Sequence, residues 1–180
     1  TIGQTITDPA APQSFILKNN GGQFTNVTEQ YCTALKNIGM VTDANWADID
    51  GDTWPDLIVV GDWMPIQIFK NNNGILDEPI SIENTSGWWQ RIEAADLDDD
   101  GDMDFVVGNW GLNSKFQSST KLPLTMQVGD FDSNGKSEFI TNWKAPNDSE
   151  TYPFSPKVEL TAQIPSLKKN NLKYKDFATM

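Results

Sequence analysis

The chain has 180 residues, enough for an ordinary domain with a hydrophobic core, and its seven tryptophans and 11% aromatic content exclude a disordered chain. The net charge of −12 disfavours partners rich in phosphate, such as nucleic acids and anionic membranes, and favours cations. Because there is no histidine and only one cysteine, the commonest general base is missing and an internal disulfide framework is excluded.

In chain order, the first predicted elements are short strands that lead into turns. Residues 15–18 precede an Asn-Asn-Gly-Gly turn sequence, and this pattern indicates the end of a preceding repeat unit. Residues 57–60 and 105–107 are short apolar runs bounded by turn residues, which predicts buried strands. Residues 65–70 alternate in polarity and predict a strand that ends in a turn at 71–74.

An acidic unit recurs three times along these elements, beginning at Asp48, Asp96 and Asp130. Each copy has a nine-residue acidic loop, a short apolar run and then an Asp-Trp or Asn-Trp pair. Small units that repeat in this way are typical of the antiparallel blades of a β-propeller. We therefore predict an all-β fold, a partial propeller of about three to four blades, over residues 1–155.

The C-terminal residues lack this repeat and predict short helices instead. Ser155 is a suitable N-cap because a proline, which is favoured at the first helical position, follows it. Leu160 and Ile164 share one helical face, and a second short helix is predicted over residues 167–172. We expect residues 156–180 to form a solvated helical insert or tail packed on the propeller. A nucleic-acid-binding patch is disfavoured because no sheet platform accompanies the lysines of this segment.

The acidic loops have the composition of calcium sites. Calcium prefers six to eight oxygen ligands, and a chain curled tightly around an ion points alternate side chains inward. We therefore expect side-chain ligands at positions 1, 3, 5 and 9 of each loop and a backbone carbonyl ligand at position 7. The side-chain ligands are Asp48, Asp50, Asp52 and Asp56; Asp96, Asp98, Asp100 and Asp104; and Asp130, Asp132, Asn134 and Glu138. The carbonyl ligands are those of Trp54, Asp102 and Lys136.

Two other interpretations of the loops are weaker. Ordinary polar turns are disfavoured because three loops of one composition each precede an equivalent apolar run. An EF-hand requires a glutamate at position 12, where this chain has Val59, Val107 and Thr141. The first loop departs from the others, with Gly51 at position 4 and Thr53 at position 6. Since a β-branched residue adopts positive φ poorly, the sequence does not define the backbone conformation of the first loop.

Negative ligand charge raises calcium affinity, so the three loops are expected to differ. The second loop has four ligand carboxylates, whereas the third has three, one asparagine and the nearby charge of Lys136. We expect the second loop to bind calcium more tightly than the third.

The pattern D-x-D-x-D-G-x-x-D followed by a short apolar strand resembles the FG-GAP repeat of the integrin-α or VCBS type. The segments Gly-Asp-Trp-Met-Pro at 61–65 and Gly-Asn-Trp-Gly-Leu-Asn at 108–113 are similar to bacterial surface proteins related to cartilage acidic protein. The resemblance covers residues 14–155. It implies a β-propeller, calcium ions in the loops, and an extracellular, cell-surface or periplasmic location.

Aromatic residues are the remaining candidates for a site. Three tryptophans occupy equivalent places after the apolar runs, which favours a role in blade packing: Trp63, Trp110 and Trp143. Three others are less regular, and either pack or stack on a sugar or a partner: Trp54, Trp88 and Trp89. The polar residues before the regular tryptophans are expected to bond to backbone between blades: Asp62, Asn109 and Asn142. Cys32 has no histidine to activate it and is expected to be a small core residue.

Two classes of function remain open from the sequence. The first is a non-catalytic module that binds a protein or a glycan in adhesion, with calcium as a structural ion. The second is an accessory or catalytic domain of a polysaccharide-active enzyme. The first is favoured because no catalytic constellation is recognisable. We expect no nucleic-acid partner and no transmembrane segment, since no stretch approaches the roughly 18 apolar residues of a membrane span.

The number of repeats also predicts that this chain does not close a propeller alone. Closed propellers have about four to eight blades, and unclosed ends expose blade edges that need a cover. We expect the cover to be the helical tail, a second copy that self-associates through those edges, or further blades of a longer parent chain.

Overall fold

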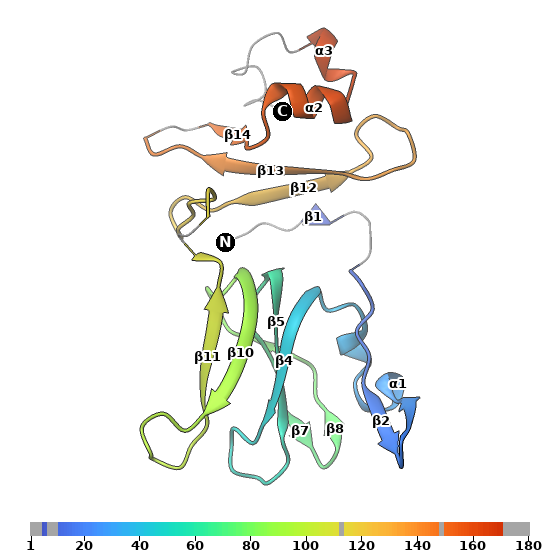
Figure 1. The fold of residues 1–180 in the computed structure, drawn as a ribbon, viewed down its shortest axis with the longest axis vertical. Coiled ribbons are helices and arrows are strands. Elements are labelled where there is room, and N and C mark those ends of the chain that lie inside the picture. Colours follow the sequence, from blue (N-terminus) through green and yellow to red (C-terminus); the bar gives the residue numbers. More distant parts are fainter. Residues whose placement is uncertain (1–4, 7–10, 112–113, 148–149, 171–180) are drawn as a thin grey trace. The chain divides into compact units, whose positions relative to one another are not determined.

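The structure, a computed structural model, describes residues 5–6, 11–111, 114–147 and 150–170, and its regular elements are mainly strands (Figure 1). The predicted all-β class is confirmed. The chain divides into two compact units, one formed by Ala11–Gly111 and one by Thr1–Ala10 with Leu112–Met180. They are called the 11–111 unit and the 112–180 unit below. In the described part of the chain, no helix has both the length and the apolar composition needed to cross a membrane.

The 11–111 unit begins with a small hairpin and two helical turns: β2 (Leu17–Asn20), β3 (Gln23–Asn26), α1 (Thr28–Tyr31) and the 3₁₀ helix η1 (Thr33–Asn37). Its other strands are β4 (Met40–Ala47), β5 (Asp56–Met64), β6 (Gln67–Phe69), β7 (Asn71–Asn72), β8 (Ile75–Leu76), β9 (Ile80–Ser81), β10 (Gly87–Ala95) and β11 (Asp104–Asn109).

The main sheet of this unit contains an arrangement like a propeller blade. Strands β4, β5, β6 and β9 are neighbours in that order, and every pair is antiparallel. Strand β10 pairs with the end of β5, and β11 pairs with β10 to form the first hairpin of a second blade. Consecutive antiparallel strands of this kind are the unit from which propellers are built.

Several predicted strands are shifted at their ends. Strand β6 covers only Gln67–Phe69 of the predicted 65–70, because Pro65 has no backbone N–H to donate. The predicted turn at 71–74 is shorter, since β7 and β8 pair and leave a two-residue turn at Asn73 and Gly74, both at positive φ.

Strand β5 is buried on both faces, as predicted for residues 57–60. Leu57 and Val59 lie in one core cluster with residues of α1–η1 and β6, including Phe69. Ile58 and Val60 lie in a second cluster with Ile92 of β10. That first cluster also includes Cys32, only 5% exposed, which confirms its predicted core role.

The prediction of a buried strand at 105–107 is wrong for its central residue, because Val106 is 57% exposed. Among the described elements β11 pairs only with β10, so it lies at the end of the sheet. Phe105 and Val107 face the second core cluster, and the alternation of the strand turns Val106 to the other face.

The 112–180 unit contains a four-stranded sheet in the order β1 (Thr5–Ile6), β12 (Thr125–Gly129), β13 (Glu138–Lys144) and β14 (Thr151–Pro153). Helices α2 (Lys157–Gln163) and α3 (Leu167–Asn170) follow. A core cluster joins Leu160, Ile164 and Leu167 to Ile140 of β13. The two helices therefore pack against β13 of this sheet.

The predicted cap of α2 is wrong by one residue. The N-cap is Pro156, whose ψ of 148° is extended, and not Ser155. The carbonyl of Pro156 accepts the amides of Glu159 and Leu160 at 2.9 and 3.1 Å, so the helix begins one residue later than predicted. The predicted second helix is present as α3, which is described over Leu167–Asn170. The residues predicted beyond 170 lie outside the described residues, and the predicted domain boundary at 155 stays a prediction.

Candidate metal centres

Each acidic loop connects two paired antiparallel strands in the same way. Residues 48–56 join β4 to β5, residues 96–104 join β10 to β11, and residues 130–138 join β12 to β13. In every hairpin the residue at position 9 pairs with the residue just before position 1, as Ala47 does with Asp56. In the 11–111 unit both loops lie at the same end of the sheet (Figure 1).

The carboxylate at position 1 organises each loop by accepting backbone amides. Asp96 accepts the amides of positions 5 and 6 at 3.2 and 3.0 Å, and Asp130 accepts the same two at 2.9 and 2.8 Å. Asp48 accepts them at 3.2 and 2.8 Å, and accepts the amide of Gly51 at 2.9 Å as well. The three loops therefore follow one backbone path.

The carboxylate at position 9 closes each loop from the other side. Asp56, Asp104 and Glu138 accept the amide of position 2 at 3.3, 3.0 and 2.9 Å. Asp56 is 1% exposed and also accepts the amide of Asn71 at 2.7 Å, which ties the first loop to β7.

Backbone angles confirm that the loops are equivalent. Position 4 has positive φ in each: Gly51 (77°), Asp99 (59°) and Ser133 (62°). Position 6 does too: Thr53 (73°), Gly101 (94°) and Gly135 (82°). The first loop thus adopts the common path, although its glycine stands at position 4 and a β-branched residue occupies position 6.

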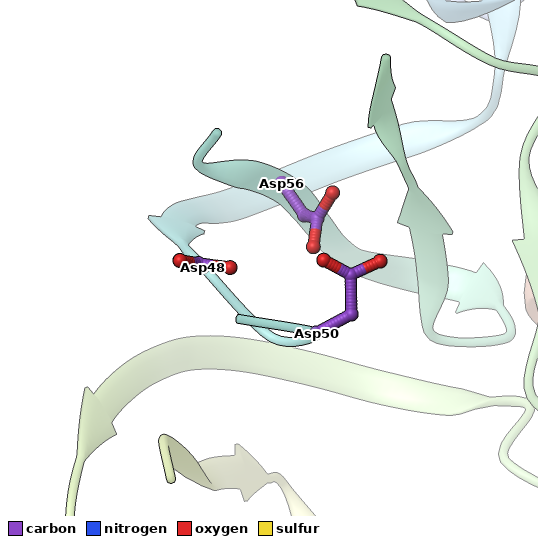
Figure 2. Close-up of side chains that lie close together, drawn as sticks. All are labelled: Asp48, Asp50 and Asp56. Atoms are coloured by element: carbon purple, nitrogen blue, oxygen red, sulfur yellow. The ribbon is translucent and has the colours of Figure 1, made fainter. Parts of the chain in front are cut away.

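This shared path brings three carboxylates together in every loop. One carboxylate oxygen from each member lies within 4.8 Å of the others in three groups: Asp48, Asp50 and Asp56; Asp96, Asp98 and Asp104; and Asp130, Asp132 and Glu138. Figure 2 shows the first group, with the three carboxylates turned toward a common point. The predicted ligands at positions 1, 3 and 9 therefore converge in all three loops.

The predicted ligands at positions 5 and 7 are placed differently. Asp52 and Asp100 lie outside the carboxylate groups. At position 5 the side-chain oxygen accepts the amide of position 7 in every loop, at 2.8 Å for Asp52, 2.9 Å for Asp100 and 2.8 Å for Asn134. A carboxylate or amide oxygen has two lone pairs, so this bond leaves one available to an ion. The carbonyl ligands expected at Trp54, Asp102 and Lys136 stay predictions.

The three groups differ in exposure and in nearby charge. The group in the second loop is exposed at all three residues, whereas Asp56 and Glu138 are buried in the first and third. In the first loop Lys70 Nζ lies 2.6 Å from Asp50 Oδ2. Its hydrogen bond lowers the pKa of Asp50, and the same bond raises the pKa of Lys70.

Sequence reasoning missed Lys70, which is 20 residues from its partner. The pairing of Leu57 with Phe69 brings the end of β6 back beside the start of β5, and so beside the first loop. A hairpin prediction extended to that register places a lysine next to the acidic loop.

The donor sets fit a hard cation such as calcium. Each group supplies only carboxylate oxygens, which calcium prefers. Three carboxylates in such proximity repel one another unless a cation or a lysine neutralises them. In the first loop Lys70 performs part of that role, while no ion pair is found for the carboxylates of the other two loops within the described residues.

The prediction that the polar residues before the regular tryptophans form hydrogen bonds to the backbone between blades is wrong. Asp62 accepts the side-chain amide of Gln90 at 2.8 Å, and Asn109 accepts the nearby amide of Gly111 at 3.1 Å. Asn142 donates to the carbonyl of Ile140 in its own strand at 3.2 Å. The end of the sheet that carries Asp62 and Asn109 is opposite the loops, because β5 and β11 run away from them.

A comparison with known protein families supports the acidic repeat identified in the sequence. A family model described as FG-GAP-like repeat matches residues 48–107, which include the first two acidic loops and most of the blade between them. The match supports the FG-GAP resemblance of the chain. No curated protein and no solved structure matches it.

Proposed function

We propose that this chain is a calcium-binding propeller module of an extracellular or cell-surface protein, and that it binds a protein or a glycan rather than catalysing a reaction. The observation that carries the calcium proposal is the common hydrogen-bond pattern of three loops, each with three convergent carboxylates. An ordinary turn has no need to gather like charges, whereas a bound divalent cation stabilises them.

The setting supports the same proposal. FG-GAP-like repeats are typical of extracellular or surface proteins, where calcium is abundant enough for sites with dissociation constants of roughly 0.1–1 mM. The motifs at 61–65 and 108–113 favour a place among bacterial surface proteins related to cartilage acidic protein.

Thermal unfolding with and without calcium tests the role of the loops. Calcium at about one hundred times its dissociation constant stabilises the native state by roughly 2.7 kcal/mol per site, so the melting temperature should rise. Magnesium should have less effect, because it requires tighter octahedral geometry. A melting curve that is unchanged between excess calcium and excess chelator would show that the loops are ordinary turns.

Calorimetric titration of two variants resolves the loops. Asp98→Ala should remove the tighter calcium step and Asp132→Ala a weaker one, since the second loop has more ligand charge. Loss of the tightest step in Asp132→Ala alone would contradict this order. Incubation with polysaccharides, followed by assay for released reducing ends, tests the catalytic alternative.

A further inference from the structure

At the end of the 11–111 unit opposite the acidic loops, three tryptophans from different strands form a continuous row. Trp63 lies near the end of β5, Trp88 near the start of β10, and Trp110 just after β11. The Trp63 and Trp88 ring centroids are 5.0 Å apart at an interplanar angle of 76°. The Trp88 and Trp110 centroids are 5.5 Å apart at 71°. Both contacts are edge-to-face, the favoured geometry of aromatic pairs.

Irregular strand pairing places the side chains of this row. The pairs Gly87 with Met64 and Trp88 with Asp62 leave Trp63 as an extra residue in β5, and its φ is +60°. A tryptophan rarely adopts that angle, so the surrounding structure must hold it there.

A second bulge lies beside the first. The pairs Trp89 with Asn109 and Arg91 with Gly108 leave Gln90 as an extra residue in β10. The Gln90 side chain donates to Asp62 Oδ1 at 2.8 Å. Bulges re-aim side chains and are enriched next to functional sites. Two of them here bring an amide and a carboxylate next to the aromatic row.

The row is only partly covered by its own residues. Trp110 is 54% exposed, Gln90 and Asn109 are exposed, and Trp63, Trp88 and Asp62 are half-buried. Partial burial of Asp62 raises its pKa, and the hydrogen bond from Gln90 opposes that rise. The surface therefore combines an exposed aromatic ring with hydrogen-bonding groups at one end of the sheet.

The geometry points to a binding platform for a neutral oligosaccharide, formed by Trp63, Trp88 and Trp110 with Asp62 and Gln90. Sugar rings offer apolar C–H faces that pack on indole, and hydroxyl groups that both donate and accept, which suits an adjacent carboxylate and amide. The net charge of −12 disfavours anionic sugars. This inference rests on the proposed binding function and names its ligand class.

The test is calorimetric titration of the full 180-residue chain, in calcium, with neutral gluco-, manno-, xylo- and galacto-oligosaccharides. We expect saturable binding of at least one of them. Trp110→Ala should weaken that binding roughly tenfold, because it removes the most exposed ring of the row. Gln90→Ala, an exposed change that leaves the aromatic packing intact, should weaken it as well.

Phe24→Ala is the matched control, because Phe24 is an aromatic residue that is also exposed, at 66%, but lies on the β2–β3 hairpin. Its affinity for sugar should equal that of the wild type. The inference is overturned if no oligosaccharide binds, or if Trp110→Ala and Gln90→Ala bind sugar as tightly as the wild type does. It is also overturned if the chain binds tetramethylammonium, a cation that packs on aromatic rings, and binds none of the sugars.

The calcium proposal and this one fail separately. If calcium leaves the melting temperature unchanged while Trp110-dependent sugar binding is present, the platform stands without the metal centres. If calcium raises the melting temperature and no sugar binds, the metal centres stand and the platform is wrong.

Discussion

Glycine is distributed differently among three loops that share one backbone path. The second and third loops have glycine at position 6 and a side chain at position 4, whereas the first has the reverse. Left-handed backbone costs a residue with a Cβ about 1–2 kcal/mol, and more when the Cβ is branched. Thr53 is therefore the most strained residue of the three loops.

Thr53→Gly should increase the free energy of unfolding by about 1 kcal/mol, because glycine adopts the angle of 73° without strain. The reciprocal change Gly101→Thr should decrease it by a similar amount. Urea denaturation in the presence of calcium measures the free energy of unfolding of both variants. Equal stabilities would mean that the strain is relieved elsewhere in the loop.

A second single residue, Lys70, affects the first loop because its ammonium group forms an ion pair with Asp50. Its ammonium and a calcium ion compete for one carboxylate, so Lys70→Met should strengthen calcium binding to the first loop roughly two- to fivefold, the range of an exposed ion pair. Terbium emission sensitised by Trp54, which is in this loop, reports on that site. The control Lys136→Met, in the third loop, should leave the Trp54 signal unchanged, and a weaker site in Lys70→Met would contradict the competition.

At the scale of the elements, sequence patterns predicted the features that are set by residues close together in the chain. The apolar, β-branched residues 57–60 form a buried strand, and the acidic spacing places position 1, 3 and 9 carboxylates together in all three loops. The bulges at Trp63 and Gln90 were not predictable, since an extra residue is defined only against the register of a partner strand. The exposure of Val106 likewise depends on which element lies beside β11.

The helical segment gives a test at this scale. Leu160 is 1% exposed in the cluster with Ile140, so Leu160→Ala should destabilise the 112–180 unit by about 2–5 kcal/mol. Val158, in the same helix but 79% exposed, is the control, and Val158→Ala should change stability by less than about 0.5 kcal/mol. Hydrogen exchange of the β12–β13 amides measures both. Equal protection in the two variants would show that α2 does not stabilise the sheet.

At the scale of the whole molecule, the 11–111 unit exposes apolar residues on strands that flank its core. Trp46 and Met40 of β4 are each 48% exposed, and Val106 of β11 is 57% exposed. In a propeller such faces contact the blades on either side. Repeats that present two different faces in sequence can also assemble head to tail between copies.

We therefore expect the chain to self-associate as its concentration rises, and Trp46→Glu to reduce that association because a carboxylate is costly to bury. Light scattering over a concentration series measures it. Phe24→Glu is the control, since Phe24 is 66% exposed but lies on the small β2–β3 hairpin. A wild-type chain that stays monomeric at every concentration would refute the expectation.

The extra residue in β5 has a consequence for insertions and deletions. Leu57 and Val59 belong to one core cluster at odd positions, yet Met64, at an even position, belongs to the same cluster. Because Trp63 is an extra residue in the strand, it shifts the alternation of the two faces by one position between Val59 and Met64. A substitution of Trp63 would remove a ring and keep the shifted alternation, whereas its deletion would restore the strict alternation and leave Met64 on the face of Leu57 and Val59. One further residue inserted between Val60 and Met64 would instead turn Met64 toward the opposite cluster. We therefore expect the strand to tolerate the deletion of Trp63 far better than such an insertion.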